Sequence, residues 1–250
     1  MIRMIIVIFL NSIRLLYILP QMRKMTKHPE KYSEATCYKM VRHLVATMKI
    51  TGGIRTKAFG LENLPEEGGY MMYPNHQGKY DVYGIVSVHK KPCTCVIDKA
   101  KSYYPFVSEL VDLLHAKRLD KYDVRQGLTV INQVAEEVAA GRRYILFPEG
   151  KYVTRNKNKM SEFKNGCFKI SLKSKTPIVP VALIDSYRVF NGFSGRAIVR
   201  TQVHFLEPIP YEEYKDLKTH EIADLVKGRI QEKLDEVASK KRFLRKLECH

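Results

Sequence analysis

From residue 54 onward, short apolar runs alternate with segments whose apolar residues recur at helical spacing. The runs "YMMYP" (residues 70–74), "CTCVID" (93–98) and "PIVPVALID" (177–185) have the length and composition of buried strands. Between them, residues 123–140 carry one apolar face and end at Gly141, as expected of a helix. This alternation predicts an α/β fold in which helices flank a central, mostly parallel or mixed sheet.

The chain has 250 residues, 45% of them hydrophobic, which is enough for one large α/β domain with a small appendage. Gly52 and Gly53 separate a helical region from the alternating part. We therefore predict an N-terminal helical segment at residues 1–50 and an α/β domain at residues 51–250. The five cysteines are odd in number, contain no C-x-x-C pair and lack zinc spacing, which predicts reduced thiols in the cytosol and no metal site.

The formal net charge is +17, and basic residues are concentrated near the N-terminus. Residues 1–60 contain 11 Lys or Arg but only two acids, Glu30 and Glu34. Basic surfaces attract nucleic acid, anionic membranes or small phosphorylated substrates. Because this basic segment is also strongly apolar, it favours a membrane surface as the partner. No stacking-aromatic RNA-binding motif is present, so we expect no nucleic-acid partner.

The first 20 residues, "MIRMIIVIFLNSIRLLYILP", predict a helix that associates with a membrane. At helical spacing Arg3, Asn11 and Arg14 fall in one narrow sector, and the remaining surface is apolar or aromatic. We expect a peripheral or monotopic helix that lies in the bilayer interface or enters it at a tilt, on the cytosolic face of the cell membrane. A cleaved signal peptide is the alternative, but no A-x-A-like site follows. Residues 30–50 predict a second amphipathic helix, which packs on its neighbours or joins the first at the membrane.

The stretch "YPNHQGKYD", residues 73–81, places His76 and Asp81 between a predicted strand and a predicted helix. Two residues five apart on one helix point about 140° away from each other, at 100° per residue. The two side chains can therefore meet only if His76 stands in the turn and Asp81 lies in the first helical turns. An aspartate near a helix N-terminus is also electrostatically favourable by itself. From the spacing alone, a catalytic pair and a simple helix-capping aspartate remain equally open.

Four sequence blocks in a fixed order decide between these readings. The blocks are "FGLENLPEEGGYMMYPNHQGKYD" (residues 59–81), "KRLDKYDVRQGL" (117–128), "FPEG" followed by "EFKNGCF" (147–168) and "TPIVPVALID" (176–185). In these blocks the chain resembles the glycerolipid acyltransferase family, most closely its lysophosphatidic acid acyltransferase type, from about Gly60 to Pro210. The resemblance favours the catalytic interpretation of the pair.

The resemblance implies transfer of a fatty acyl group from acyl-CoA or acyl-carrier protein to the 2-hydroxyl of lysophosphatidic acid. The product would be phosphatidic acid, as in phospholipid biosynthesis. His76 would be the general base that takes the proton of the attacking hydroxyl, and Asp81 would hold the other ring nitrogen. An imidazole, whose reference pKa is about 6.5, suits this role near neutral pH. The thioester is already activated, so the resemblance implies no covalent intermediate, no metal and no bound cofactor.

For acceptor binding the resemblance implies a set of charged and turn residues. Arg118, from the second block, would contact the acceptor phosphate, with Lys99 nearby. Glu149 and Gly150 would shape the acceptor site. The family often continues the "FPEG" block with Thr and then Ser or Arg, whereas this chain continues with Lys151 and Tyr152. Lys151 or Arg155 would then replace the expected arginine, although Lys is a point charge and not a bidentate fork.

Two other functions remain open at this point. The first keeps the chemistry and changes the acceptor to glycerol-3-phosphate or another lysolipid. The second is a non-catalytic basic module that binds an anionic membrane or nucleic acid. Substitution of His76 distinguishes the classes, because a binding module keeps its function without this imidazole.

Overall fold

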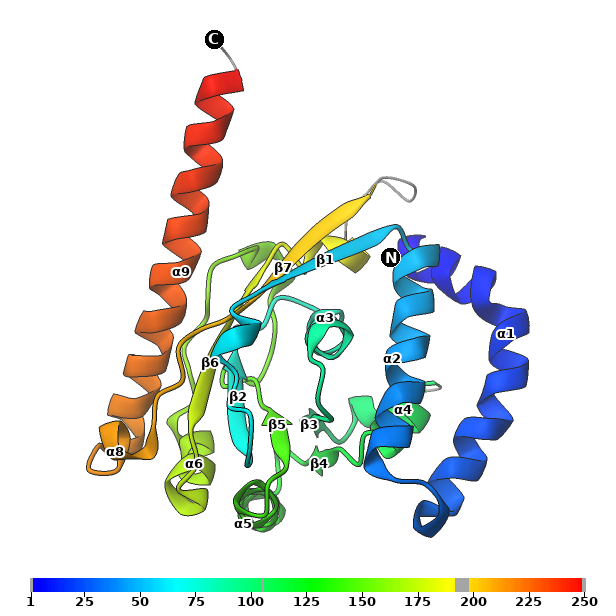
Figure 1. Ribbon diagram of the computed structural model, residues 1–250, viewed down its shortest axis with the longest axis horizontal. Coiled ribbons are helices and arrows are strands. Elements are labelled where there is room, and N and C mark those ends of the chain that lie inside the picture. The colour runs from blue at the N-terminus through cyan, green and yellow to red at the C-terminus, as the bar shows by residue number, and fades with distance from the viewer. Residues whose placement is uncertain (1, 105, 192–197, 249–250) are drawn as a thin grey trace.

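The computed structural model describes residues 2–104, 106–191 and 198–248, and a seven-stranded sheet forms its centre (Figure 1). The strands are β1 (Ile54–Phe59), β2 (Tyr70–Pro74), β3 (Thr94–Asp98), β4 (Lys117–Leu119), β5 (Arg143–Ile145), β6 (Ile178–Ile184) and β7 (Val199–Phe205). They lie in the order β1-β7-β6-β2-β5-β3-β4, and the β6–β7 pairing alone is antiparallel among the described strands. The predicted α/β fold with a mostly parallel, mixed sheet is confirmed.

Helices cover both faces of this sheet (Figure 1). They are α1 (Ile2–Lys27), α2 (Glu34–Thr51), α3 (Asp81–Val88), α4 (Val107–Leu113), α5 (Val124–Ala139), α6 (Lys169–Ser174), α7 (Arg188–Asn191), α8 (Tyr211–Tyr214) and α9 (Thr219–Glu248). Local signals set several bounds. The Asp123 carboxylate caps α5 by accepting from the backbone N–H of Gln126, at 3.0 Å. After α5, Gly141 takes a φ of +104°, which a residue with a side chain rarely adopts.

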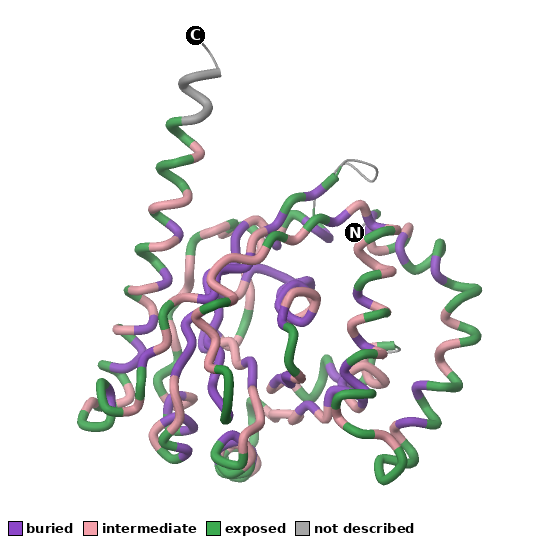
Figure 2. The backbone as a smooth tube through the Cα atoms, viewed as in Figure 1, coloured by how far each residue is buried: buried purple, intermediate pink, exposed green. Residues whose placement is uncertain are grey.

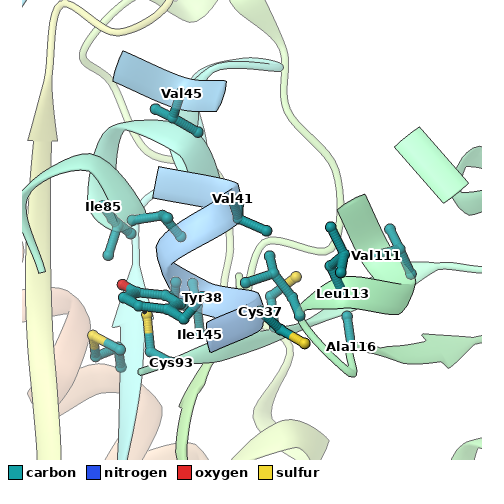
Figure 3. Close-up of a cluster of buried hydrophobic side chains, with 14 of the residues drawn as sticks. Cys37, Tyr38, Val41, Val45, Ile85, Cys93, Val111, Leu113, Ala116 and Ile145 are labelled. Carbon is teal, nitrogen blue, oxygen red and sulfur yellow. Dashed lines mark hydrogen bonds between the residues drawn. The ribbon is translucent and has the colours of Figure 1, made fainter. Parts of the chain in front are cut away.

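The central strand β2 divides the core into two parts because successive side chains of a strand point to opposite faces. Tyr70 and Met72 pack with the helices α2, α3 and α4 on one face of the sheet. Met71 and Tyr73 pack with α5, α6 and α9 on the other face. Figure 3 shows the first part, in which residues of α2 such as Val41 meet buried residues of α3, α4 and the sheet. The helical segment thus shares its core with the sheet, and the domain boundary at residue 50 stays a prediction.

The polar side of α1, formed by Arg3, Asn11 and Arg14, faces α2 and the residue that follows it. Arg3 is buried and donates through Nη1 to the carbonyl oxygen of Gly52, and Nδ2 of Asn11 donates to Oγ1 of Thr51 at 2.9 Å. Arg14 meets Nε2 of His43 on α2. These contacts tie α1 to the C-terminal end of α2 through polar groups, so that the apolar residues of α1 are left to face outward.

Figure 2 shows exposed residues along much of the first part of α1, and large apolar side chains are prominent among them. The exposed large side chains there are Ile2, Ile5, Ile8, Phe9, Leu10, Ile13, Leu16 and Tyr17. With 26 residues and a mean hydropathy of 2.0 in its most apolar window, α1 is long and apolar enough to cross a membrane by length and composition. Further along α1, Met22 and Met25 are buried in the core, so this end of the helix belongs to the folded domain.

A neutral histidine is buried at the C-terminal end of α3. His89 has no exposed surface, its Nδ1 lies 2.7 Å from the carbonyl oxygen of Lys91, and its Nε2 lies 2.7 Å from the hydroxyl of Tyr70. Nδ1 therefore carries the proton and Nε2 accepts from the tyrosine. Desolvation lowers the pKa of His89 to about 4, because burial penalises the charged imidazolium.

Candidate active site

Two polar turns meet at one edge of the sheet. β2 ends at Pro74 and β5 ends at Ile145, and the two strands are parallel neighbours. Their carboxyl ends therefore point to the same edge, which is where open α/β sheets bind ligands. The turn that follows β2 contains His76, and the turn that follows β5 contains Glu149.

His76 and Asp81 are in direct contact at this edge. Nδ1 of His76 lies 2.7 Å from Oδ2 of Asp81, with His76 in the turn and Asp81 at the first residue of α3. The same Oδ2 accepts from the backbone N–H groups of Gln77 (2.5 Å) and Gly78 (2.9 Å). The carboxylate thus fixes the turn and the ring together. With Nδ1–H donated to Asp81, the lone pair of a neutral ring lies on Nε2, where a general base needs it.

Two aromatic rings confine the imidazole of His76. The ring of Phe147 stacks on it with a centroid distance of 4.1 Å and an interplanar angle of 26°. The ring of Tyr152 meets it edge-on, at 4.9 Å and 78°. The His76 side chain keeps 17% of its surface exposed, while that of Asp81 has none. This packing limits rotation of the base and covers most of its surface.

Glu149 joins the two turns. Its Oε1 accepts from the backbone N–H of His76 at 2.7 Å, and its Oε2 accepts from the backbone N–H of Ser161 at 2.8 Å. The residue is 4% exposed, and this burial raises the pKa of its carboxyl group. Gly150 follows with a φ of +67°, and a Cβ there would lie 3.2 Å from Cε of Lys164. Both residues shape the turn beside His76, and their predicted contact with an acceptor stays a prediction.

Among the residues that the structure describes, no contact of the three predicted cations with His76 is found. Arg118 lies on the edge strand β4, about 14 Å from β2 at about 4.8 Å per strand. Its Nη2 lies 2.6 Å from Oδ1 of Asp112, and its Nε lies 3.0 Å from Oγ of Ser102. Lys99 is exposed, with Nζ 3.5 Å from Oδ2 of Asp120. Lys151 is also exposed. The roles of these three residues in acceptor binding stay predictions.

A cation that the sequence reasoning missed lies closer to the pair. Nζ of Lys101 lies 5.1 Å from the centroid of the Tyr152 ring, whose edge meets His76. Such a position is typical of a cation–π contact. Within residues 2–104, 106–191 and 198–248, no ion pair of Lys101 is found. A lysine three residues after a strand carries no sequence signal of its own, whereas Tyr152 is visible as a departure from the family pattern.

No metal centre is evident among the residues that the structure describes, because no three His, Cys, Asp or Glu residues come together there. The cysteines within the described ranges are free thiols: Cys37, Cys93 and Cys95 are buried, and Cys167 is half-buried. Burial raises the pKa of the Cys93, Cys95 and Cys167 thiols to about 12, which makes them poor nucleophiles. The expected absence of a metal and of a cofactor stays a prediction.

The chain is similar to a known protein family and to individual known proteins. The family described as Acyltransferase matches residues 55–184, which include both turns. The 1-acyl-sn-glycerol-3-phosphate acyltransferase of Saccharomyces cerevisiae is 29% identical over 219 residues, which cover 84% of this chain and 68% of the yeast protein. The 1-acyl-sn-glycerol-3-phosphate acyltransferase alpha of Ovis aries is 28% identical over 193 residues, 76% of this chain and 66% of that protein.

A solved structure shares the fold. The crystal structure of the 1-acyl-sn-glycerophosphate acyltransferase PlsC from Thermotoga maritima superposes with a TM-score of 0.76 and 16% sequence identity. The match covers 94% of this chain and 95% of that one. At this coverage the match extends into the N-terminal helical segment as well as the sheet. This chain spans about two thirds of the length of the yeast and sheep proteins.

Proposed function

The chain belongs to the acyltransferase family, and we propose that it transfers a fatty acyl group from acyl-CoA or acyl-carrier protein to the 2-hydroxyl of lysophosphatidic acid, forming phosphatidic acid. The observation that carries this proposal is the contact of His76 with Asp81, at 2.7 Å, inside the matched region. The names of the yeast and sheep relatives support the acceptor.

The proposed reaction needs one base and no covalent enzyme intermediate. Nε2 of His76 takes the proton of the acceptor hydroxyl as its oxygen attacks the thioester carbonyl carbon. The tetrahedral intermediate then collapses, the carbon–sulfur bond breaks, and the imidazolium returns the proton to the leaving sulfur. Asp81 stabilises the imidazolium between these steps and keeps the proton on Nδ1.

The acceptor class is supported by Lys101, which lies over the ring that meets His76. A phosphate favours charge-assisted contacts. Lys101 lies over Tyr152 with no ion pair in the described ranges. Arg118, on the edge strand β4, forms an ion pair with Asp112 of α4. Lys101 precedes Ser102, whose hydroxyl oxygen accepts from Nε of Arg118, so both cations belong to the region around the loop after β3. Glycerol-3-phosphate and other lysolipids present similar groups and are the alternative acceptors.

We place the protein at the cytosolic face of the cell membrane as a peripheral or monotopic protein. The outward face of α1 exposes large apolar side chains such as Phe9 (75%) and Ile13 (72%). A helix of this kind inserts its apolar face among lipid headgroups and acyl chains. Basic residues near an anionic leaflet add about 1 kcal/mol each. Membrane association would let a lipid acceptor and a lipid product enter and leave without crossing water.

One assay of the purified full-length protein tests the proposal. Radiolabelled acyl-CoA and acyl-carrier protein are each offered with lysophosphatidic acid, glycerol-3-phosphate and other lysolipids, and the lipid products are separated. We expect phosphatidic acid from lysophosphatidic acid, and a loss of about 10² to 10⁴-fold in turnover for His76→Ala. The exposed His220→Ala serves as a matched control that keeps activity. Labelled product from another acceptor alone would correct the substrate, and full activity in His76→Ala would refute the mechanism.

A further inference from the structure

The second oxygen of the Asp81 carboxylate also has a dedicated partner. Oγ of Ser186 lies 2.5 Å from Oδ1 of Asp81, although the two residues are 105 positions apart. Ser186 is 4% exposed and stands two residues after the end of β6, one residue beyond the fourth sequence block. The carboxylate therefore accepts from His76 and two backbone groups on Oδ2 and from a side-chain hydroxyl on Oδ1.

Ser186 donates its single hydroxyl proton in a hydrogen bond to Asp81. Oγ of Ser186 is also 3.0 Å from Oε1 of Gln77, but that oxygen already accepts from the backbone N–H of Ser186 at 2.9 Å. Oδ1 of Asp81 has no other donor among the described residues and is both closer and charged. A hydrogen bond to an ionised group is shorter and stronger than one between neutral groups. The proton is therefore donated to the carboxylate.

The turn that carries Ser186 is held from several sides. Asp185 has a φ of +61°, a left-handed conformation that is unusual for a residue with a side chain. Its backbone N–H donates to Oδ1 of Asn158 at 2.9 Å, and its Oδ1 accepts from Nδ2 of the same residue at 3.0 Å. Nζ of Lys241, on α9, lies 2.6 Å from Oδ2 of Asp185. This anchoring fixes the direction of the Ser186 hydroxyl.

We propose that Ser186 is a positioning residue that donates to Oδ1 of Asp81 and thereby limits how strongly the His76–Asp81 pair holds a proton. A donor on Oδ1 withdraws negative charge from the carboxylate, so the imidazolium of His76 gains less from its contact with Oδ2. A weaker hold favours the neutral imidazole, which is the form that accepts a proton. The catalytic consequence rests on the proposed function, whereas the effect on protonation does not.

The other polar groups around the pair come from the turn after β5 and from the loop after β3. Glu149 binds the backbone of His76, Tyr152 meets the ring of His76, and Lys101 lies over Tyr152. None of these three groups contacts Ser186 in the described structure, so a substitution of Ser186 leaves them in place. The effect of the hydroxyl can thus be measured separately from theirs.

The test is the titration of the His76 ring in the full-length protein, followed by NMR with isotope-labelled histidine. The His76 signal is assigned by its loss in His76→Gln. In Ser186→Ala we expect the midpoint of the His76 titration to rise by about half to one pH unit, since a hydrogen bond to the charged carboxylate is lost. Ser186→Thr keeps the hydroxyl and should restore the wild-type midpoint. Ser174→Ala, which removes a buried hydroxyl bonded to Ser171 and Thr176, is the matched control.

The outcomes separate this inference from the proposed function. An unchanged or lowered midpoint in Ser186→Ala would overturn the inference, whatever the activity. If Ser186→Ala does not fold, Ser186→Cys, a weaker donor of similar size, should shift the midpoint in the same direction by less, and no shift there also overturns it. In the acyl transfer assay the acid limb of the kcat/KM profile should move upward with the midpoint. An inactive wild-type protein would refute the proposed function, and the titration would still decide the role of Ser186.

Discussion

Nδ1 of His76 lies 2.7 Å from Oδ2 of Asp81, and the exposed fraction falls from 17% for the His76 side chain to none for that of Asp81. The carboxylate of Asp81 is therefore fully shielded from solvent, whereas part of the His76 ring remains accessible to it. Electrostatic interactions are stronger where water is excluded, so the buried carboxylate acts strongly on the ring. The exposed part of the imidazole is left for a substrate.

Replacing Asp81 by asparagine should abolish most of the activity without removing any atom from the core. All four partners of the carboxylate, on His76, Gln77, Gly78 and Ser186, are donors. An amide group would present its own N–H to donors and would favour the wrong tautomer of His76. We expect kcat to fall by about 10³-fold, measured in the acyl transfer assay. Asp123→Asn, at the exposed cap of α5, is the matched control, and equal kinetics for the two variants would contradict a catalytic Asp81.

Removing Lys101 should weaken acceptor binding more than turnover. Its ammonium lies over Tyr152 without an ion pair in the described ranges, so it is available to a phosphate. A hydrogen bond to a charged group contributes about 1.5 to 3 kcal/mol, so Lys101→Ala should raise the acceptor KM by about 10-fold or more. Steady-state kinetics at varied acceptor concentration measure this. The exposed Lys90→Ala should leave KM unchanged, and a fall in kcat alone would argue against phosphate binding by Lys101.

Arg118→Ala should also raise the acceptor KM if the second sequence block contacts the phosphate. Arg118 is bound to Asp112 at 2.6 Å and to Ser102 at 3.0 Å, so its loss would also loosen the turn at residues 101–103. The variant Ser102→Ala separates the two effects, because it removes the hydroxyl that joins Arg118 to the turn and keeps the guanidinium. We expect the acceptor KM to rise in Arg118→Ala but not in Ser102→Ala. A large loss of kcat with an unchanged acceptor KM would rule out the predicted role of Arg118.

Introducing charged residues on the outward face of α1 should weaken the binding of the protein to membranes. Phe9 and Ile13 are exposed, and burying a large apolar side chain contributes about 1.5 to 3 kcal/mol. In a sedimentation assay with anionic liposomes, the double variant Phe9→Asp and Ile13→Asp should bind at least about 10-fold more weakly. Tyr122→Asp, which changes a side chain exposed to 99%, is the control. Undiminished binding of the double variant would place the anchor elsewhere, with the basic tail from Lys240 as the next candidate.

Salt should weaken this membrane binding only in part, because the apolar contribution is not screened. Point substitutions test the anchor better than deletion of residues 1–25, since Met22 and Met25 belong to the core. Removing them would expose buried surface of α2 and α4 and change the stability of the whole domain.

The free energy of unfolding should fall as the pH is lowered below about 6.5, in part because of His89. Its pKa is lowered to about 4 in the folded protein by burial, while an unfolded imidazole titrates near about 6.5. Between these two values the unfolded chain binds the extra proton, so stability increases with pH across this window and is fully present above it. The loss by about pH 5 is about 2 kcal/mol for this residue. His204, whose pKa is also lowered to about 4 by burial, adds to it.

Urea unfolding at about pH 7 and about pH 5 measures this effect. In His89→Gln the amide can still donate to Lys91 and accept from Tyr70, but it carries no titratable proton. The difference in unfolding free energy between the two pH values should therefore shrink in His89→Gln relative to the wild type. An identical difference in both proteins would show that His89 does not titrate in this range.

Much of the fold follows from local patterns. The alternation of apolar runs with helical segments predicted the sheet, and residues 123–140 were predicted as a helix that the structure has at Val124–Ala139. These signals act within a few residues, through the period of 2 in strands, the period of 3.6 in helices, caps and glycine. A contact between His76 and Asp81 could also be considered from the sequence, because the two residues are only five positions apart and lie where a turn leads into a helix.

Other parts of the site depend on the order of the strands. The contacts of Glu149 with His76, and of Ser186 with Asp81, span 73 and 105 residues. They form because β2 lies between β5 and β6, so the ends of these three strands meet at one edge. Lys101 reaches Tyr152 for a similar reason, since β3 is the next neighbour of β5.

The sequence by itself determined the succession of strands and helices and the apolar character of the first helix, because each depends on residues close together in the chain. The spacing of His76 and Asp81 allowed their contact without deciding it, and the resemblance of four sequence blocks to a known family favoured it. Only the tertiary structure decided that Arg3 and Asn11 face the protein, that Arg118 is held by Asp112, and that Ser186 completes the shell of Asp81. These contacts join segments that become neighbours through packing of the sheet and its helices, and no local period or spacing encodes which distant polar groups packing will bring together.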